Sequence, residues 1–490
     1  MYTVLMILML LIPASAGIAE ACMKRASKLA QDALLVSALA AETLLYAMLL
    51  FLPVNSGFLL FSMTDVLTIK FRMDGFSILF LSLVTVGFLL AGIFATAYMD
   101  HSGNRSGFYA FLLFSQFALV GMDNAANLIT MYMFFEMATL LSIPLVLHDR
   151  TPEAISASMK YLFYSIAGAL LGLLFIFVAS RYSVTLDFTR GGSLDLSAVS
   201  GHETLLLVVS LLGVVGFGAK AGMYPLHGWL PDAHPVAPAP ASAVLSGVIT
   251  KAGVLAILRL IYFVVGPDFL RGTWVQTVLL SLALLTVFMG SMMAYRQDVL
   301  KKRLAYSSVS QISYVLTGLF LLTDQGVQGG LLQVLFHACV KICLFLCAGS
   351  MIFHTGKTKV SEFLGIGKTM PVTLWSFTIA SLSLIGIPPA AGFISKWYLA
   401  AGALESGLPV MNWLVPVILL VSALLTAAYL LPVTIRGFFP GKNFVHSGQR
   451  TDGIPEFWLP LVILAGMSLL LGIFGGTVTE WTASLASLVM

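Results

Sequence analysis

Residues 211–231 read LLGVVGFGAKAGMYPLHGWLP, an apolar run with one lysine near its middle and turn-forming residues at its end. A run of this length can cross a bilayer as a helix. A charge such as Lys220 at the bilayer centre costs about 2.5–3.5 kcal/mol on insertion scales, so it marks a functional position. Gly222 and Pro225 follow, and proline inside a span breaks the helix and frees backbone carbonyls. The stretch therefore predicts a broken membrane helix that carries a functional lysine.

The composition of the whole chain agrees with a membrane protein. Of its 490 residues, 59% are apolar and only 10% are charged, whereas soluble domains carry about 25% charged residues. These values exclude a soluble globular enzyme, an intrinsically disordered protein and a nucleic-acid binder. The formal net charge of +4 is too small to indicate a polyanionic partner. We predict an all-α polytopic membrane protein.

Apolar runs separated by breakers predict about fourteen membrane helices. The first run lacks a basic segment before it and is followed by Lys24, Arg25 and Lys28, which favours a retained span over a cleaved signal peptide. Residues 53–75 are too polar to span and are expected to form a hairpin-like segment. The predicted spans are 2–21, 32–52, 76–98, 107–124, 126–147, 160–180, 204–225, 240–263, 274–295, 304–323, 328–353, 371–400, 410–435 and 456–476.

The basic residues between these spans predict the orientation in the membrane. Fifteen of the 26 Lys and Arg residues fall in loops after odd-numbered predicted spans and six in loops after even-numbered ones. By the positive-inside rule the odd-numbered loops face the cytoplasm, and both termini lie on the outer side of the cell inner (plasma) membrane.

The five remaining basic residues are lysines within or at the end of predicted spans, namely Lys160, Lys220, Lys251, Lys341 and Lys396. Such residues are expensive in a bilayer unless the interior is hydrated or paired. Lysine loses its proton readily when it is desolvated, so these groups are suited to carry and release protons.

Acidic partners for these lysines are few. Glu136 lies mid-span in MYMFFEMATLLSIP (131–144), where a buried lysine is its natural counter-ion. Glu42 and Asp123 also fall inside spans, and for Glu42 a structural hydrogen bond is the alternative interpretation.

Two further spans contain chemistry-bearing residues. In SLIGIPPAAGFISKWYL (383–399), two prolines precede Lys396, and two broken helices in separate halves are typical of inverted-repeat transporters, although two unrelated kinks would give the same pattern. His337 and Lys341 lie four residues apart on one helix face. Histidine titrates near neutrality, so this pair indicates a proton relay, whereas a single buried histidine is more often a packing residue.

Three cysteines, Cys339, Cys343 and Cys347, recur every four residues in the same span. They are interpreted as packing residues rather than metal ligands.

Four segments resemble one known family, and the resemblance covers nearly the whole chain. They are GFGAKAGMYPLHGWLPDAHPVAPAPASAVLSGVITKAGVLAILR (216–259), KKRLAYSSVSQISYVLTG (301–318), FHACVKICLFLCAGS (336–350) and GIPPAAGFISK (386–396). They closely resemble the antiporter-like proton-translocating membrane subunits of respiratory complex I, Mrp-type sodium/proton antiporters and membrane-bound energy-converting hydrogenases.

The resemblance implies a domain plan and a set of relay residues. The plan has N-terminal helices in 1–106, a first inverted repeat of helices 4–8 in 107–263, a second of helices 9–13 in 274–435, and a last helix in 436–490. The implied proton relay consists of Glu136, Lys220, Lys251, His337, Lys341 and Lys396, with no cofactor and no metal. Gln311 stands where some family members carry histidine, so a link through that helix would need water.

The resemblance does not select one complex. Lysine instead of glutamate at position 396 points away from the middle antiporter-like subunit of bacterial complex I. The compact length points away from the distal one and towards the Mrp antiporter member of similar size or a hydrogenase subunit, and the LPDAHP segment (230–235) favours the hydrogenase and complex I members. The expected partners are other membrane subunits, the lipid bilayer and protons, with sodium as the alternative ion.

The working hypothesis is electrostatic proton pumping, in which a Glu136–Lys220 pair controls the charge of Lys220 and passes protons on to Lys396. Three alternatives stay open: sodium transport, with carboxylates as ligands; a structural subunit that conducts nothing; and an oxidoreductase that handles quinone or a metal centre itself. No C-x-x-C pair or G-x-G-x-x-G fingerprint supports the last of these.

Overall fold

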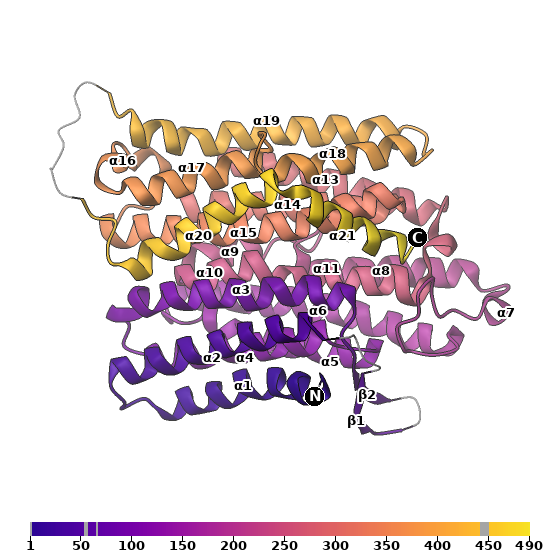
Figure 1. Ribbon diagram of the computed structural model, residues 1–490. Coiled ribbons are helices and arrows are strands. Elements are labelled where there is room, and N and C mark those ends of the chain that lie inside the picture. The colour runs from indigo at the N-terminus through magenta and orange to yellow at the C-terminus, as the bar shows by residue number, and fades with distance from the viewer. Residues whose placement is uncertain (1, 53–56, 65–66, 442–449) are drawn as a thin grey trace.

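In the computed structural model of the chain, which describes residues 2–52, 57–64, 67–441 and 450–490, nearly parallel helices run side by side (Figure 1). Thirteen helical stretches in the described residues are long and apolar enough to cross a membrane. The chain is therefore a multi-pass, all-helical membrane protein.

The long helices match the predicted spans closely. They are α1 (Tyr2–Cys22), α2 (Lys28–Leu50), α3 (Gly75–Tyr98), α4 (Arg105–Asp123), α5 (Leu128–Val146), α6 (Pro152–Tyr182), α8 (Glu203–Ala221), α13 (Trp274–Arg296), α14 (Leu300–Leu321), α15 (Asp324–Thr355), α19 (Met411–Phe438) and α20 (Pro455–Ile473), with one continuous span from Ala239 to Val265 built from α10 (Ala239–Val244), η2 (Leu245–Ile249), α11 (Thr250–Arg259) and η3 (Leu260–Val265).

Short elements connect the long ones. They are β1 (Phe58–Ser62), β2 (Thr68–Phe71), η1 (Met99–His101), α7 (Leu196–Val199), α9 (Leu230–Val236), α12 (Pro267–Leu270), η4 (Val360–Glu362), α16 (Ile366–Thr369) and α21 (Gly475–Ser487). The antiparallel β1–β2 pair lies in the region predicted as a hairpin, of which residues 53–56 and 65–66 lie outside the described residues. Lys442, one of the predicted cytoplasmic lysines, also lies outside them.

The predicted span 371–400 is split into α17 (Pro371–Ile385) and α18 (Gly392–Glu405), each too short to cross a bilayer alone. Gly386 ends α17 in the left-handed conformation (φ 93°), which glycine adopts without strain. Pro388 and Pro389 then lack the N–H groups that would continue the helix. The predicted break before Lys396 is confirmed.

The second predicted break lies after α8, where Gly222 closes the helix in the left-handed conformation with φ 80°. Residues 223–229 form turns, and α9 follows, so the predicted span 204–225 ends four residues early at Ala221. Pro225 sits within these turns, as its missing N–H requires. The break places Lys220 in the last turn of α8, next to irregular backbone.

One predicted boundary, the start of the sixth span, needs a larger correction. Helix α6 starts at Pro152, eight residues before the predicted start, because the Thr151 side chain accepts a hydrogen bond from the Ala154 N–H and caps the helix. The last predicted span, 456–476, ends at Ile473, and the chain continues as α21. Both termini lie at the same end of the bundle, shared with the hairpin (Figure 1).

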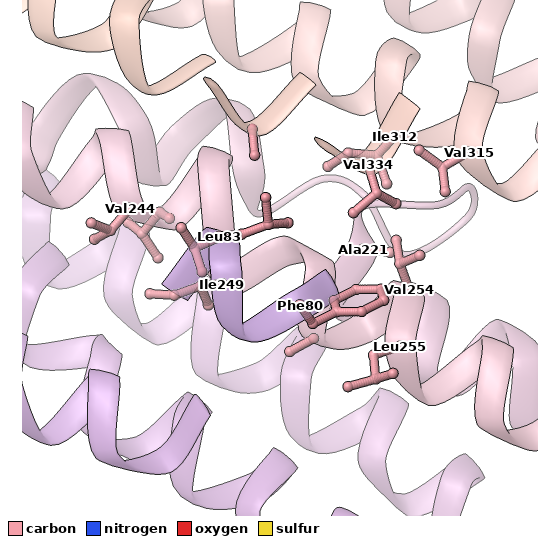
Figure 2. Close-up of a cluster of buried hydrophobic side chains, with 14 of the residues drawn as sticks. Phe80, Leu83, Ala221, Val244, Ile249, Val254, Leu255, Ile312, Val315 and Val334 are labelled. Carbon is pink, nitrogen blue, oxygen red and sulfur yellow. The ribbon is translucent and has the colours of Figure 1, made fainter. Parts of the chain in front are cut away.

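The core runs through the centre of the bundle and joins helices from both halves of the chain. Figure 2 shows Phe80 of α3, Ala221 of α8, Val254 of α11 and Ile312 of α14 among the side chains of one buried cluster. At Gly253 a Cβ would meet the backbone N of Ala221 at 2.6 Å, so glycine lets α11 lie directly against α8. This packing fixes the spacing between the helices that carry Lys220 and Lys251.

Candidate proton-relay site

The six predicted relay residues come from five different helices. Glu136 is on α5, Lys220 on α8, Lys251 on α11, His337 and Lys341 on α15, and Lys396 on α18. Lys220, Lys251, His337 and Lys341 are each no more than 1% exposed. Membrane helices bury such ionisable groups only where other polar groups hydrogen-bond or pair with them.

Lys220 is hydrogen-bonded to the backbone of α5. Its Nζ donates a hydrogen bond of 2.5 Å to the carbonyl oxygen of Phe135 and lies 4.1 Å from the centre of the Phe135 ring. Both the carbonyl and the ring face attract a cation. The lysine is thus held beside Glu136 through the residue that precedes it.

The expected ion pair between Glu136 and Lys220 is not formed in this conformation. No ion pair within 4.0 Å joins these two described residues, and Oε1 of Glu136 is buried without a hydrogen-bond partner. Glu136 is only half-buried, because its helix lies at the side of the bundle. The carboxylate and the lysine therefore lie on neighbouring helices without an ion pair between them.

Lys251 and His337 form the only direct contact between two of the six relay side chains in the described residues. The Lys251 Nζ lies 2.7 Å from Nδ1 of His337, and it also donates to the carbonyl oxygen of Ser246 at 2.5 Å. Ser246 belongs to the π-helical segment η2, whose wider turn leaves this carbonyl open to a side chain. A proton can therefore pass between α11 and α15 without an intervening water.

Lys341 lies on the same face of α15 as His337 but turns towards α14. Its Nζ donates to the carbonyl oxygen of Leu304 at 3.0 Å and to the hydroxyl of Ser307. The two residues of the predicted pair therefore contact different helices, His337 reaching α11 and Lys341 reaching α14.

The Lys396 side chain lies at the break between α17 and α18. Its Nζ donates to the carbonyl oxygens of Leu384 and Ile385, both at 2.6 Å, and lies 5.4 Å from the ring centre of Tyr314. These carbonyls belong to the last turn of α17, where the helix itself leaves acceptors unpaired. The broken helix thus supplies the partners for the lysine.

A small cavity connects the histidine with this break. It is lined by Gln333, Phe336, His337, Val340, Ser383, Leu384 and Gly392, and the space open to the centre of a water molecule is about 10 Å³. A cavity of that size holds about one water. Nε2 of His337 and the hydroxyl of Ser383 are buried without hydrogen-bond partners, which are the groups such a water would bridge.

Gln311 takes part in a separate chain of hydrogen bonds. Gln333 donates to its side-chain oxygen at 2.9 Å, and Ser395 donates to the side-chain oxygen of Gln333 at 2.5 Å. Direct side-chain contacts thus run from α14 through α15 to the residue before Lys396.

The structure corrects the interpretation of Lys160. The early start of α6 places it two turns from the helix end, 39% exposed, and its Nζ pairs with Asp232 of α9 at 2.6 Å. Lys302 lies 3.6 Å from the same carboxylate. Lys160 is therefore an ion-paired, partly exposed residue in the first turns of α6 and not an isolated intramembrane lysine.

Sequence reasoning misses or misplaces other buried polar residues. The span prediction leaves Lys301 in a loop, but it is 6% exposed and donates to the carbonyl oxygen of Ala237 at 2.8 Å. His234 of α9 is fully buried, stacks on Phe345 at 4.6 Å and has two unpartnered ring nitrogens. Arg259 is counted with the loop residues although it lies inside the predicted span 240–263; it is 2% exposed and pairs with Asp74 at 2.6 Å. The period of the apolar residues gives no sign of this burial, although the LPDAHP motif singles out the segment of His234.

Glu42 is buried in α2, and neither carboxylate oxygen has a hydrogen-bond partner. The structural hydrogen bond considered for it is absent from the described residues.

The sequence of this chain matches one family model and several known proteins. Residues 125–426 match the family model described as NADH:quinone oxidoreductase/Mrp antiporter, TM. NADH-quinone oxidoreductase subunit N of Desulforudis audaxviator is 36% identical over 366 residues, which are 74% of this chain and 71% of that protein. Hydrogenase-4 component B of Escherichia coli is 34% identical over 67% of this chain and 50% of its own length.

A solved structure shows the same fold. A chain of the Mrp complex from Dietzia sp. DQ12-45-1b superposes with a TM-score of 0.86 at 21% identity, covering 100% of this chain and 97% of that one. Homologues of this kind are subunits of multisubunit membrane complexes. Because the family model matches more than half of this chain, the chain belongs to the family of antiporter-like membrane subunits shared by complex I, Mrp antiporters and related hydrogenases.

Proposed function

We propose that this chain translocates protons within a multisubunit membrane complex, along a relay formed by Glu136, Lys220, Lys251, His337, Lys341 and Lys396. The single observation that carries the proposal is the 2.7 Å contact between Lys251 and His337. Two basic groups in direct contact are rarely both protonated, since each positive charge disfavours the charged form of the other group. One proton shared between them is the arrangement that a relay requires.

The first half of the relay is controlled by Glu136. Lys220 rests on the Phe135 carbonyl, while the neighbouring carboxylate has one unpartnered oxygen and a half-exposed side chain. When Glu136 turns to Lys220, the lysine keeps its proton; when a neighbouring protein of the complex pulls the carboxylate away, the proton is released towards Lys251. Buried pairs of this kind are strongly coupled because the local dielectric is low.

The second half of the relay leads from His337 to Lys396. The one-water cavity joins the unpartnered Nε2 of His337 to Ser383 and Leu384, and Leu384 supplies a carbonyl to Lys396. A proton leaving His337 can therefore reach Lys396 through a water held at the break in the helix. Lys396 then releases it on the side towards which α18 runs.

We further propose the repeat organisation and orientation for this chain. Residues 107–263 and 274–435 form two inverted repeats, each with one broken helix and one relay lysine beside the break. The basic loops, which gather at the end of the bundle away from the termini, face the cytoplasm in the cell inner membrane, so the termini lie on the outer side.

The relay is tested by Lys220→Ala and Glu136→Ala in the assembled complex, reconstituted in vesicles. We expect proton flux driven by an imposed membrane potential to fall by roughly two orders of magnitude or more, the range lost with a positioned proton-transfer group. The matched control is Lys359→Ala, which removes an exposed loop lysine from the same complex. Unimpaired flux in the two relay variants would overturn the proposal. Replacing protons by sodium in the same assay decides whether sodium is carried instead.

A further inference from the structure

A polar basin lies at the end of the bundle away from the termini, where three loops meet (Figure 1). The loops connect α1 to α2, α3 to α4 and α5 to α6. Except for His101 at the last position of one span, the lining residues lie outside the membrane-spanning helices, so the basin is at the membrane surface. Its volume is about 600 Å³, and it is lined by Lys24, His101, Ser102, Gly103, Asn104, His148, Asp149 and Arg150.

Two exposed cationic side chains, Lys24 and Arg150, line the basin. Neither forms an ion pair within 4.0 Å with any residue that the structure describes. Asp149 is the one acidic residue in the lining. Burial lowers the pKa of His148, so its ring is neutral at pH 7 and shares a 2.7 Å hydrogen bond with the Ser102 hydroxyl. Lys24 and Arg150 together outweigh Asp149, which favours an anion in the basin.

A narrow slot continues from the basin into the membrane between α4 and α5. It has a volume of about 70 Å³ and is lined by Asn104, Gly107, Phe111, Pro144, Leu147, His148 and Arg150. Asn104, His148 and Arg150 also line the basin, so the two cavities are continuous. The other four residues are apolar. One helical turn from Pro144, Leu140 is 56% exposed on α5, so exposed apolar surface continues below the slot.

We propose that the basin and the slot together bind one anionic phospholipid of the bilayer, with its phosphate at Lys24 and Arg150 and an acyl chain in the slot. Lysine and arginine bind phosphate through charge-assisted hydrogen bonds, and basic pockets between membrane helices hold anionic headgroups. The order of the two cavities, charged at the surface and apolar below it, is the order of the groups in such a lipid. None of the six relay residues lines either cavity, so this inference is independent of the proposed function.

A seat for an acidic loop of a neighbouring subunit is the competing explanation, because a positive basin also attracts acidic side chains. The slot distinguishes the two. It lies between two membrane helices and is apolar below the basin, where a hydrocarbon chain fits and an acidic loop would lose the hydration of its charges. A zwitterionic lipid also fits the slot, but it brings a cation of its own, which Lys24 and Arg150 repel.

The first test compares ligands on the assembled complex after detergent has removed its lipids. Binding of dioleoyl phosphatidylglycerol, dioleoyl phosphatidylcholine and glycerol phosphate is measured by the rise in melting temperature. We expect phosphatidylglycerol to bind at least about tenfold more tightly than the other two, since it alone has both a net negative charge and acyl chains. Equal affinity for glycerol phosphate would show a free-anion site, and equal affinity for phosphatidylcholine a non-selective groove. Either result, or no binding of phosphatidylglycerol, would overturn the proposal.

The second test removes the two cations one at a time. Arg150→Gly suits the backbone, because Arg150 has a φ of 51°, a left-handed conformation that glycine adopts without strain. Arg150→Gly and Lys24→Ala should each weaken phosphatidylglycerol binding about fivefold, the effect of one charge beside an anionic lipid. Lys357→Ala, which removes an exposed lysine that does not line the basin, is the control and should bind like wild type. Wild-type affinity in both basin variants would contradict the proposed phosphate position.

Filling the slot tests the acyl chain separately. In Gly107→Leu the new Cβ would lie 2.5 Å from Oδ1 of Asn104, an exposed side chain that can turn away. We expect the affinity for phosphatidylglycerol to fall to that for glycerol phosphate, whose own binding stays unchanged. Gly466→Leu, at a position with nothing within 4 Å of the new Cβ, should bind like wild type. Undiminished phosphatidylglycerol binding in Gly107→Leu would place the chain outside the slot and overturn the proposal.

Discussion

At the scale of single residues, the structure shows what holds each buried cation. The sequence identified Lys220, Lys251, Lys341 and Lys396 as intramembrane residues, and all four are received by backbone carbonyls. A pattern of residue types cannot reveal carbonyl partners, because every residue has a carbonyl and only the fold decides which ones are left open. For the same reason the sequence predicted a carboxylate partner for Lys220 where the structure shows the Phe135 carbonyl.

A residue-scale prediction concerns the ion pair of Asp74 with Arg259, just outside the start of α3. Burial opposes ionisation of Asp74, but the Arg259 guanidinium and hydrogen bonds from Ser77 lower its pKa overall. A carboxylate whose folded pKa is depressed contributes stability above its unfolded pKa of about 4, and this is lost as the pH falls through the lower folded pKa.

We therefore expect Asp74→Asn to lower the free energy of unfolding in detergent by about 3 kcal/mol at pH 7, because it leaves the guanidinium without its partner. Asparagine still caps α3, so only the charge pair is tested. The difference from wild type should shrink below pH 4. Asp195→Asn, an exposed capping residue of α7, is the control and should leave stability unchanged. A pH-independent difference would contradict this assignment.

At the scale of elements, the sequence predicted the positions of the long helices and both breaks, because apolar length and proline are local signals. It predicted fourteen spans where the described residues contain thirteen, because the stretch 371–400 is divided into two short helices. It misplaced the start of α6 because the cap at Thr151 precedes a polar first turn, in which hydropathy is low although the backbone is helical. It could not place α9 or the π-helical turns, whose geometry depends on packing against other helices. The burial of His234 and Lys301 follows from these elements and was missed with them.

The close contact of α8 and α11 gives the prediction at this scale. In Gly253→Ala the new Cβ would lie 2.6 Å from a backbone nitrogen of Ala221, which cannot move without shifting α8. We expect a loss of about 1–3 kcal/mol in stability, typical of overpacking, together with reduced flux. Gly466→Ala on α20 meets nothing within 4 Å, so unchanged or higher stability is expected there. Equal effects of the two substitutions would show that the helix spacing is not fixed at Gly253.

At the scale of the whole molecule, the residues of the proposed relay are distributed across the bundle from α5 to α18 and do not follow any one helix. Glu136 lies at the side of the bundle, and Lys396 lies at a break between two short helices. Resemblance to the family supplied the six residues that we propose as the relay, but a resemblance does not give the order in which they contact one another. Order depends on which helices touch, and the contact of Lys251 with His337 joins residues 86 positions apart.

The central claim is that protons pass through the contact of Lys251 with His337, and proton flux through the reconstituted complex tests it most directly. Flux under an imposed membrane potential should fall by roughly two orders of magnitude in Lys251→Ala. It should be partly retained in Lys251→His, which keeps a titratable nitrogen beside His337. Flux in Lys251→Ala equal to that of the wild-type complex would contradict the account.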